Sequence, residues 1–384
     1  MNTCRSSFLI LVAGMVIARG NATGMEAPPP RSRAEVQAVL DRTPRPDTNA
    51  VLRPLHVLLV AGPKDHGPGE HDYPAWQRQW AALLAKAPGV RVSTAFPWPE
   101  PQQWEGVDLA VFYLKTRWDA QQLAEIRRHQ ARGGGVVTIH WAIGCDQDWD
   151  DHAEHFGLSY KSASYRHGPT ELRLARPEHP VLLGLPGTMH FADEPYWPFI
   201  GDRSRVQVLA TSDEKINQGD DRRNNPGDDT VETVPVFWTY EPPGTGARVF
   251  VSIFGHYMWT FDDPFFRLLL LRGMCWAAKD NPYRLDPLAL EGANYAHFLP
   301  NGSLSLFEPS PSGVDLVGVE VPDLRHGEGF ADLGHPFLPF LLSHESDPFD
   351  LRAVRGGELD IVPHRVEVPA MEVVEVCEQP RFAL

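Results

Sequence analysis

The segment LHVLLVAGPKDHGPGEHDYPAW, residues 55–76, indicates the fold of this chain. Its first seven residues, 55–61, form a continuous apolar run, which is typical of a strand buried on both faces of a parallel sheet. A loop rich in glycine, proline and ionisable residues follows, and a helix is expected from Pro74. In that helix the apolar residues recur at helical spacing, at Trp76, Trp80, Leu83 and Leu84. The segment therefore predicts a strand, a loop and a helix in succession.

The same alternation continues along the chain. Further strands are expected at residues 90–95, 108–114, 136–140, 206–211, 234–240 and 248–254. A helix is expected after Asp119, which forms a capping-box pattern with Gln122, and another after Asp262 or Asp263, where Pro264 suits the first helical turn. Strands that alternate with helices predict a doubly wound, mostly parallel α/β sheet.

The ends of the chain differ from this pattern. Residues 1–24 contain Arg5, an eleven-residue apolar run at 8–18 and then small residues, which together predict a secretory signal peptide. A short membrane anchor is the alternative, although the run is too short to span a bilayer comfortably. We therefore expect a periplasmic or secreted protein with no stable membrane span.

Three further parts follow the expected signal peptide. Residues 25–54 are rich in proline and arginine and predict a linker with room for one short helix. Residues 55–284 form the predicted α/β domain. Residues 285–384 lack the helix alternation and predict a β-rich C-terminal extension, in which Asn301-Gly302 is a hairpin signal.

Composition narrows the classes of function. The chain has 384 residues and a net charge of −15, which argues against binding to nucleic acid or to an anionic membrane surface. A metal ion or a neutral or cationic small molecule fits this charge better. Of the four cysteines, Cys4 lies in the expected signal, and Cys145, Cys275 and Cys377 show no metal-binding spacing. The sequence therefore predicts no disulfide framework.

Histidines follow three of the predicted strands. His66 and His71 lie in the loop after the first strand, His140 ends the GGGVVTIH segment, and His256 follows the 248–254 strand. Because ligands in open α/β sheets bind at the carboxyl ends of the strands, these histidines predict a functional site at that edge.

Several ordered blocks resemble the ThuA-like proteins, a family named for trehalose utilisation. The blocks are GGGVVTIH at 133–140, EHPVLLGLPGTMHFADEPYW at 178–197, PVFWTY at 235–240, GARVFVSIFGH at 246–256 and MCWAA at 274–278. The resemblance covers roughly residues 55–280. It implies a flavodoxin-like fold similar to that of the class I glutamine amidotransferases, and a role in the use of a disaccharide or a keto-sugar.

The likeness to the amidotransferases fails at the nucleophile. Those enzymes carry a cysteine on the turn after a buried strand and a histidine after a late strand. His140 and His256 hold the corresponding positions here, and Cys145 lies five residues beyond the turn. Without a thiolate at the turn, glutamine hydrolysis is not expected.

Two uses of these histidines remain open. Neutral imidazoles and a carboxylate are good ligands for Zn²⁺, and His66, His140 and His256 are the expected metal ligands. Alternatively, His140, His256 and Glu194 form a catalytic acid/base group, because histidine exchanges protons near neutral pH. His71 could complete either arrangement, or it could lie with Asp72 at the start of the following helix. Glu194 could equally serve in a cap or an ion pair.

Aromatic residues beside these motifs are candidates for sugar binding. Trp141, Tyr196 and Trp238 could stack on a sugar ring, although tryptophan more often belongs to the core. The resemblance to the ThuA-like proteins implies a carbohydrate hydrolase or lyase with a small-molecule sugar as its partner. A noncatalytic carbohydrate-binding or scaffold protein is the alternative, and the sequence leaves the oligomeric state open.

Overall fold

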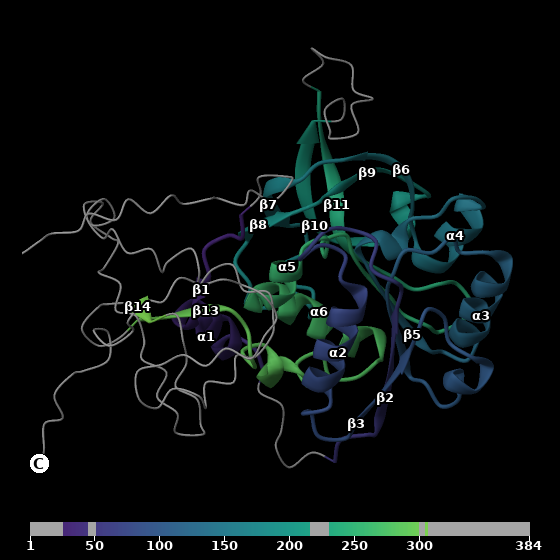
Figure 1. Ribbon diagram of the computed structural model, residues 1–384, viewed down its shortest axis with the longest axis horizontal. Coiled ribbons are helices and arrows are strands. Elements are labelled where there is room, and N and C mark those ends of the chain that lie inside the picture. The colour runs from purple at the N-terminus through teal and green to yellow at the C-terminus, as the bar shows by residue number, and fades with distance from the viewer. Residues whose placement is uncertain (1–25, 45–50, 216–229, 299–303, 306–384) are drawn as a thin grey trace, which may run out of the picture. The chain divides into compact units, whose positions relative to one another are not determined.

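The computed structural model describes residues 26–44, 51–215, 230–298 and 304–305 (Figure 1). All of these residues belong to the compact unit Met1–Phe330, and the second unit, Ala331–Leu384, lies outside them. The expected signal peptide and most of the expected β-rich extension also lie outside the described residues.

A nine-stranded sheet forms the centre of the fold, in the order β3-β2-β4-β5-β12-β11-β10-β7-β8. Its first five strands run parallel to one another: β3 (Val90–Ala95), β2 (Leu55–Ala61), β4 (Leu109–Tyr113), β5 (Gly135–Ile139) and β12 (Val249–Ser252). Numbered along the chain, they follow the order 2-1-3-4-5, which is the flavodoxin-like order. The predicted doubly wound α/β fold is confirmed. The apolar runs of the sequence become strands that are buried on both faces.

Four antiparallel strands extend this sheet beyond β12. They are β11 (Val231–Tyr240), β10 (Gln207–Lys215), β7 (Gly168–Leu174) and β8 (Thr188–Asp193). A separate two-stranded sheet pairs β6 (Ser159–Tyr165) with β9 (Tyr196–Ile200). The sequence analysis predicts no strand between residues 159 and 200, because β7 alternates buried and exposed residues and so lacks a continuous apolar run. The turn between β8 and β9 carries Glu194.

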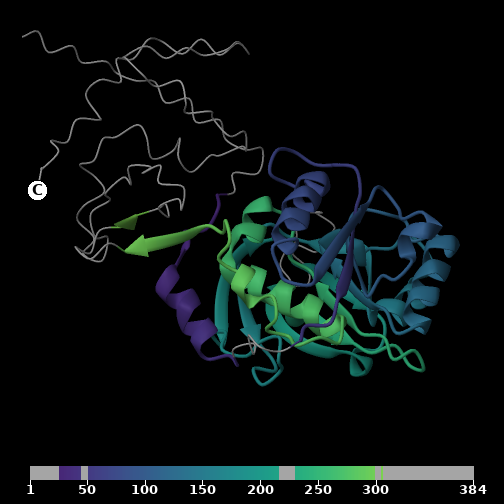
Figure 2. The ribbon, with the colours of Figure 1, turned by 90° about the horizontal axis from the view of Figure 1, so that it is seen from below.

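Helices cover both faces of the parallel strands (Figures 1 and 2). α2 (Tyr73–Leu84) and α6 (Pro264–Ala277) pack on one face, and α3 (Ala120–Ala131) and α4 (Trp149–Phe156) pack on the other. Asp72, Asp119 and Asp263 cap the N-termini of α2, α3 and α6 through their side chains, which confirms the predicted helix starts. Every residue of α6 is buried, so this helix belongs to the core.

Shorter elements complete the described part of the chain. They are α5 (Met258–Asp262) and the 3₁₀ helices η1 (Pro101–Trp104), η2 (His140–Ile143), η3 (Arg203–Arg205) and η4 (Asp286–Leu288). None of the helices in the described ranges is both long enough and apolar enough to cross a membrane.

The segment expected to be a linker contains a docked helix. α1 (Arg33–Asp41) buries Val36 and Val39 in the hydrophobic core, and a capping box at Ser32 begins it. The preceding strand β1 (Arg31–Ser32) pairs with β13 (Tyr295–Phe298), which pairs antiparallel with β14 (Leu304–Ser305). The expected turn residues Asn301 and Gly302 themselves lie outside the described residues.

A buried ion pair joins α6 to the segment that follows it. The Arg272 side chain is 0% exposed and contacts the Asp286 carboxylate through two parallel bonds, Nε to Oδ1 at 2.9 Å and Nη2 to Oδ2 at 2.8 Å. Its Nη1 donates to the carbonyl of Leu183 at 2.7 Å. The guanidinium therefore connects three separate segments inside the core.

Substitution of Asp286 tests this connection. We expect Asp286→Ala to lower the free energy of unfolding by about 3–5 kcal/mol, because it leaves a buried guanidinium without its counter-charge. The control is Lys86→Ala, which removes the exposed Lys86–Glu291 pair and should cost less than about 1 kcal/mol. Urea unfolding followed by circular dichroism measures both, and equal effects would contradict the proposed role of Arg272.

Candidate functional site

Four side chains meet at the carboxyl edge of the parallel strands. His71 lies in the loop after β2, His140 directly follows β5, Glu194 lies between β8 and β9, and His256 lies between β12 and α5. One ligand atom from each residue lies within 4.8 Å of the others. All four residues are at most 5% exposed. We call these four residues the His/Glu cluster.

Backbone geometry places the histidines. His71 and His140 have φ values of 42° and 56°, in the left-handed region that residues other than glycine seldom adopt. The loop after β2 is fixed to the segment after β12, since the His71 amide donates to the His256 carbonyl at 3.0 Å and the Met258 amide donates to the Gly69 carbonyl at 2.9 Å. The cluster therefore rests on a locally constrained backbone.

Asp193, the last residue of β8, holds two of these segments together. Its buried carboxylate accepts hydrogen bonds from the amides of Glu194, Gly255 and His256 at 2.7, 3.2 and 3.1 Å. The hydroxyl of Thr260 also donates to it. Asp193 thus positions Glu194 against the end of β12, a role that the sequence analysis does not assign to it.

Hydrogen bonds fix the tautomers of two rings. His140 Nδ1 lies 2.7 Å from the carbonyl oxygen of Ile253, and His71 Nδ1 lies 2.9 Å from Asp65 Oδ1. Both partners can only accept, so each Nδ1 carries a proton and each Nε2 of the neutral ring carries a lone pair. Imidazoles that bind metal are commonly held in this way by a carboxylate or a backbone carbonyl.

Burial and ion pairing together set the charges of the cluster. Burial lowers the pKa of His71 to about 3, despite the opposing effect of Asp65, so this ring is neutral near pH 7. Burial alone would raise the pKa of Glu194, but the bonds with His140 and His256 hold that pKa well below its usual range. Burial likewise lowers the pKa of His256, and the Glu194 carboxylate more than offsets this effect, so that this pKa is raised.

Glu194 lies between two imidazoles. Its Oε2 atom is 3.0 Å from His140 Nε2 and 2.8 Å from His256 Nδ1. With a proton on His140 Nε2 this contact is a hydrogen bond to the carboxylate, whereas a bare Nε2 lone pair would repel the carboxylate oxygen at this distance. A proton or a metal cation between them removes that repulsion.

The hydroxyl of Tyr196 completes the polar surroundings. It lies 2.7 Å from His140 Nε2 and 3.2 Å from Glu194 Oε2, and its ring stacks on Tyr160 with a centroid distance of 4.3 Å. Burial raises the pKa of Tyr196 well above its usual value, so the hydroxyl keeps its proton and acts as a donor. It has one proton for two neighbouring acceptors.

The cluster fits a divalent transition metal. It offers three imidazoles and one carboxylate, a donor set that suits Zn²⁺. His71 Nε2 and His256 Nε2 are buried and have no hydrogen-bond partner among the described residues. These two nitrogens face the same cluster, where a bound cation would satisfy them.

The structure brings His140, Glu194 and His256 together as the sequence analysis expects, and adds His71 to them. His66 lies outside the cluster: its side chain is 38% exposed and bonds to Asp65 at 3.0 Å. His71 directly precedes Asp72, the N-cap of α2, whereas His66 lies in the middle of a glycine-rich loop. That adjacency to a predicted helix start is the signal that could have favoured His71 from the sequence.

Of the three aromatic candidates for sugar binding, two lie at the site and one lies in the core. Tyr196 belongs to the site, and the half-buried Trp141 packs edge-on against it with a centroid distance of 5.9 Å. Trp238 is fully buried in the hydrophobic core, where its indole nitrogen donates to the carbonyl of Phe156. His167, which the sequence analysis does not identify, lies beside the cluster with Nε2 3.5 Å from Glu194 Oε1 and Nδ1 2.8 Å from the Tyr257 hydroxyl.

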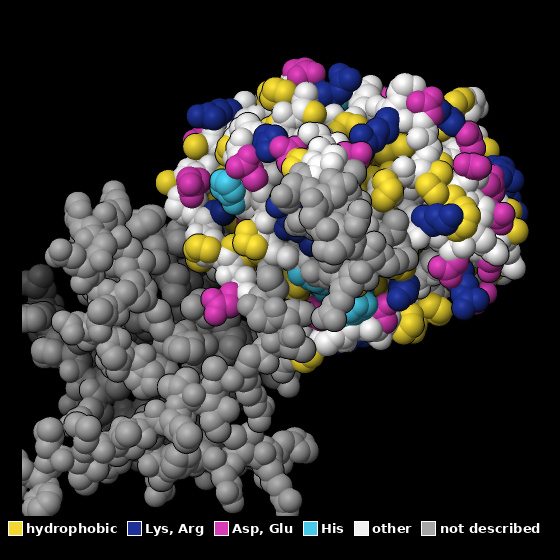
Figure 3. Space-filling model, turned by 90° about the horizontal axis from the view of Figure 1, so that it is seen from above, with side chains coloured by type: hydrophobic (Ala, Val, Ile, Leu, Met, Phe, Trp, Pro, Cys, Tyr) yellow, Lys and Arg dark blue, Asp and Glu magenta, His cyan; other side chains and the backbone are white. Residues whose placement is uncertain are grey.

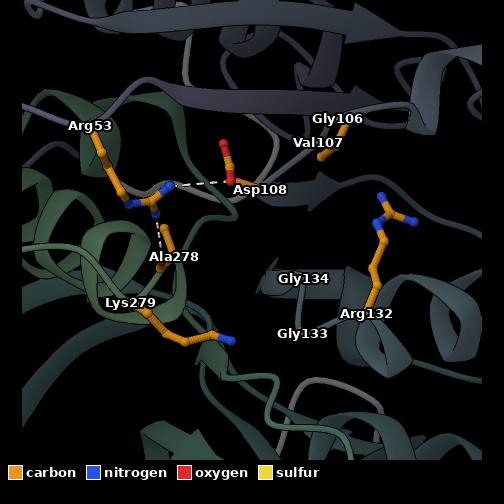
Figure 4. Close-up of a pocket in the computed structure, with 9 residues that line it drawn as sticks. All are labelled: Arg53, Gly106, Val107, Asp108, Arg132, Gly133, Gly134, Ala278 and Lys279. Carbon is orange, nitrogen blue, oxygen red and sulfur yellow. Dashed lines mark hydrogen bonds and ion pairs between the residues drawn. The ribbon is translucent and has the colours of Figure 1, made fainter.

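A hollow of about 420 Å³ lies at the opposite edge of the sheet (Figure 4). Arg53, Arg132 and Lys279 line it together with Asp108. Arg53 donates to the carbonyl of Ala278, and Arg132 donates to that of Trp104. Both arginines therefore bind backbone carbonyls of the fold. On the described part of the face seen in Figure 3, acidic and basic side chains are interspersed.

Comparisons with known proteins concern the family and the fold of the chain. Residues 66–277, more than half of the chain, match the ThuA family, described as trehalose utilisation. No curated protein matches the chain.

Among solved structures, a ThuA-like protein from Parabacteroides merdae is 21% identical over 59% of this chain and 90% of its own, with a TM-score of 0.42. A ThuA-like protein from Bacteroides uniformis is 16% identical over 62% and 98%, with a TM-score of 0.46. The glutaminase domain of Trypanosoma brucei CTPS is 9% identical over 59% and 94%, with a TM-score of 0.33.

Removal of a cluster residue tests the metal fit. We expect His71→Ala to weaken Zn²⁺ binding by more than about 100-fold, beyond what the loss of an outer hydrogen bond causes. The matched control is His190→Ala, an exposed histidine on β8 that should leave the affinity unchanged. Calorimetric titration of the metal-free protein measures both, and equal affinities in the two variants would exclude His71 as a ligand.

Proposed function

The chain belongs to the ThuA family, and from this premise we propose that its His/Glu cluster is a metal-dependent active site for a carbohydrate. The proposed ligands are His71, His140, Glu194 and His256, and Zn²⁺ is the first candidate ion. The proposed reaction is hydrolysis or lyase-type cleavage of a disaccharide or a keto-sugar. The family description, trehalose utilisation, supports this substrate class.

The unpartnered Nε2 of His71 is the observation that carries the metal proposal. Its ring is neutral and almost fully buried, and its other nitrogen is already bonded to Asp65. A buried acceptor without a partner costs about 1–3 kcal/mol, which a bound cation would recover. The close approach of His140 Nε2 to Glu194 Oε2 supports the same conclusion.

A bound Zn²⁺ would act as a Lewis acid that polarises a substrate oxygen or acidifies a water molecule. The residues of the chain have separate tasks. Asp65 and the Ile253 carbonyl hold two imidazoles in the ligating tautomer, and Asp193 positions Glu194. The Tyr196 hydroxyl can turn from His140 and donate its proton to a substrate oxygen.

The surroundings of the cluster suit a neutral sugar. Trp141 is half-buried, so part of its indole can stack on a sugar ring beside Tyr196. The net charge of −15 disfavours a strongly anionic substrate. His167 is 17% exposed, so it lies between the buried cluster and solvent.

We propose that the protein has no glutamine amidotransferase activity. The turn after β5 carries His140 where those enzymes carry a cysteine. The nearby Cys145 bonds through its thiol to the Gln147 carbonyl, and burial raises its pKa. A thiol that is protonated at neutral pH is a weak nucleophile.

Chelation separates the proposed site from its alternatives. We expect turnover of a disaccharide or a 3-keto-glycoside to be lost when Zn²⁺ is removed, and to return when Zn²⁺ is restored. Activity that is indifferent to chelator would favour the acid/base group instead. Binding of these sugars without turnover would favour the noncatalytic carbohydrate-binding protein.

Export to the periplasm or the medium is proposed from residues 1–24. We expect the exported protein to begin between about residues 21 and 28, the usual range for signal cleavage. N-terminal sequencing of protein from the periplasmic fraction measures this. Retention of Met1 in a cytoplasmic protein would contradict the proposal.

A further inference from the structure

The His/Glu cluster is closed to solvent, so a metal ion needs a route to it. Its four residues are at most 5% exposed. Asp65 and His66 lie on its solvent side, with 25% and 38% of their side chains exposed. Both residues belong to the loop after β2, which also carries His71.

These two residues form a second group of possible ligands, which shares His71 with the cluster. Asp65 Oδ1 contacts His66 Nδ1 at 3.0 Å and His71 Nδ1 at 2.9 Å. The ligand atoms of Asp65, His66 and His71 lie within 4.8 Å of one another, and His71 belongs to this group and to the cluster. The His66 ring lies 3.9 Å from that of His71 and 5.4 Å from that of His256, measured between centroids.

We propose that Asp65 and His66 form an uptake site, at which a divalent cation binds transiently before it passes to the His/Glu cluster. The inference rests on the proposed function, because it requires the cluster to hold a metal. His66 binds the ion during its passage. It no longer contacts the ion once the ion is held by the cluster.

The exposed carboxylate of Asp65 favours this route over the other exposed neighbour of the cluster, His167. The uptake site pairs an imidazole with a carboxylate that reaches solvent, and Lys115 Nζ lies only 3.6 Å from Asp65 Oδ2. An arriving cation would displace this ammonium, which also lies over the Trp141 ring at 4.8 Å. His167 faces Tyr257 and the buried Glu194, so it presents no exposed carboxylate to an ion.

Metal-uptake kinetics test the proposal without any enzyme assay. The metal-free protein is mixed rapidly with Co²⁺, and the visible absorbance of the bound ion gives both rate constants. We expect His66→Ala to lower the association and dissociation rate constants together, each by about tenfold, since about 1.4 kcal/mol lost from a passage state raises both barriers equally. The dissociation constant should stay within about twofold of the wild type.

Two further variants test whether the change in the rates of metal binding and release arises at the uptake site. Lys115→Gln should increase the association rate about two- to fivefold, because it removes the competing ammonium and its repulsion of the ion. His190→Ala is the control at an exposed histidine on β8 and should leave both rates unchanged. Asp65→Asn is unsuitable, because Asp65 also orients His71.

The outcomes are distinguishable. Unchanged rates in His66→Ala would overturn the uptake site alone. A weaker equilibrium affinity with an unchanged association rate would make His66 a permanent ligand and would also overturn it. Wild-type protein that binds neither Co²⁺ nor Zn²⁺ would overturn the proposed function and the uptake site together.

Discussion

The arrangement of the site depends on the hydrogen bonds that the buried carboxylate of Asp193 accepts. It accepts hydrogen bonds from the segment that carries Glu194 and from the segment that carries His256. Hydrogen bonds to a charged group contribute about 1.5–3 kcal/mol each, whereas the same carboxylate left without donors would be strongly unfavourable in the core. The antiparallel strands therefore cannot move away from β12 without a large loss of folding free energy. This constraint holds the segments that carry Glu194 and His256 side by side at the His/Glu cluster.

The side chains of the His/Glu cluster are less well satisfied in hydrogen bonds than the scaffold around them. Asp193 has a full set of donors, whereas His71 and His256 each keep a buried nitrogen without a partner among the described residues. The backbone at His71 and His140 is held in the left-handed region. Such locally unfavourable conformations cost folding free energy and persist only where the surrounding structure imposes them. They concentrate at functional sites. The stability of the parallel sheet thus supports a site in which buried histidine nitrogens remain without a hydrogen-bond partner among the described residues.

The parallel half of the fold and the histidine edge can be predicted from the sequence, because each rests on local patterns. Continuous apolar runs mark β2, β4 and β5, and the histidines stand directly after such runs. In the antiparallel half, β10 and β11 are expected from the sequence, but β7 resists prediction, since it shows the weaker alternation of a strand with one face exposed. The choice between His66 and His71 depends on how the loop folds back onto the segment after β12. The core position of Trp238 depends on its contact with the distant Phe156.

The same reasoning explains why this site differs in kind from that of the glutamine amidotransferases. The turn after β5 is shared with that fold, but here its side chain faces two imidazoles and a carboxylate supplied by three other segments. Thiolates are also good zinc ligands, so a cysteine at position 140 would be a further candidate ligand for the proposed metal. A nucleophilic cysteine needs a histidine that is free to take its proton, and both neighbouring imidazoles are engaged with Glu194 or Asp65. The chemistry of this edge is therefore set by the partners brought by β8, β12 and the loop after β2, and the residue at the turn alone could not restore the amidotransferase reaction.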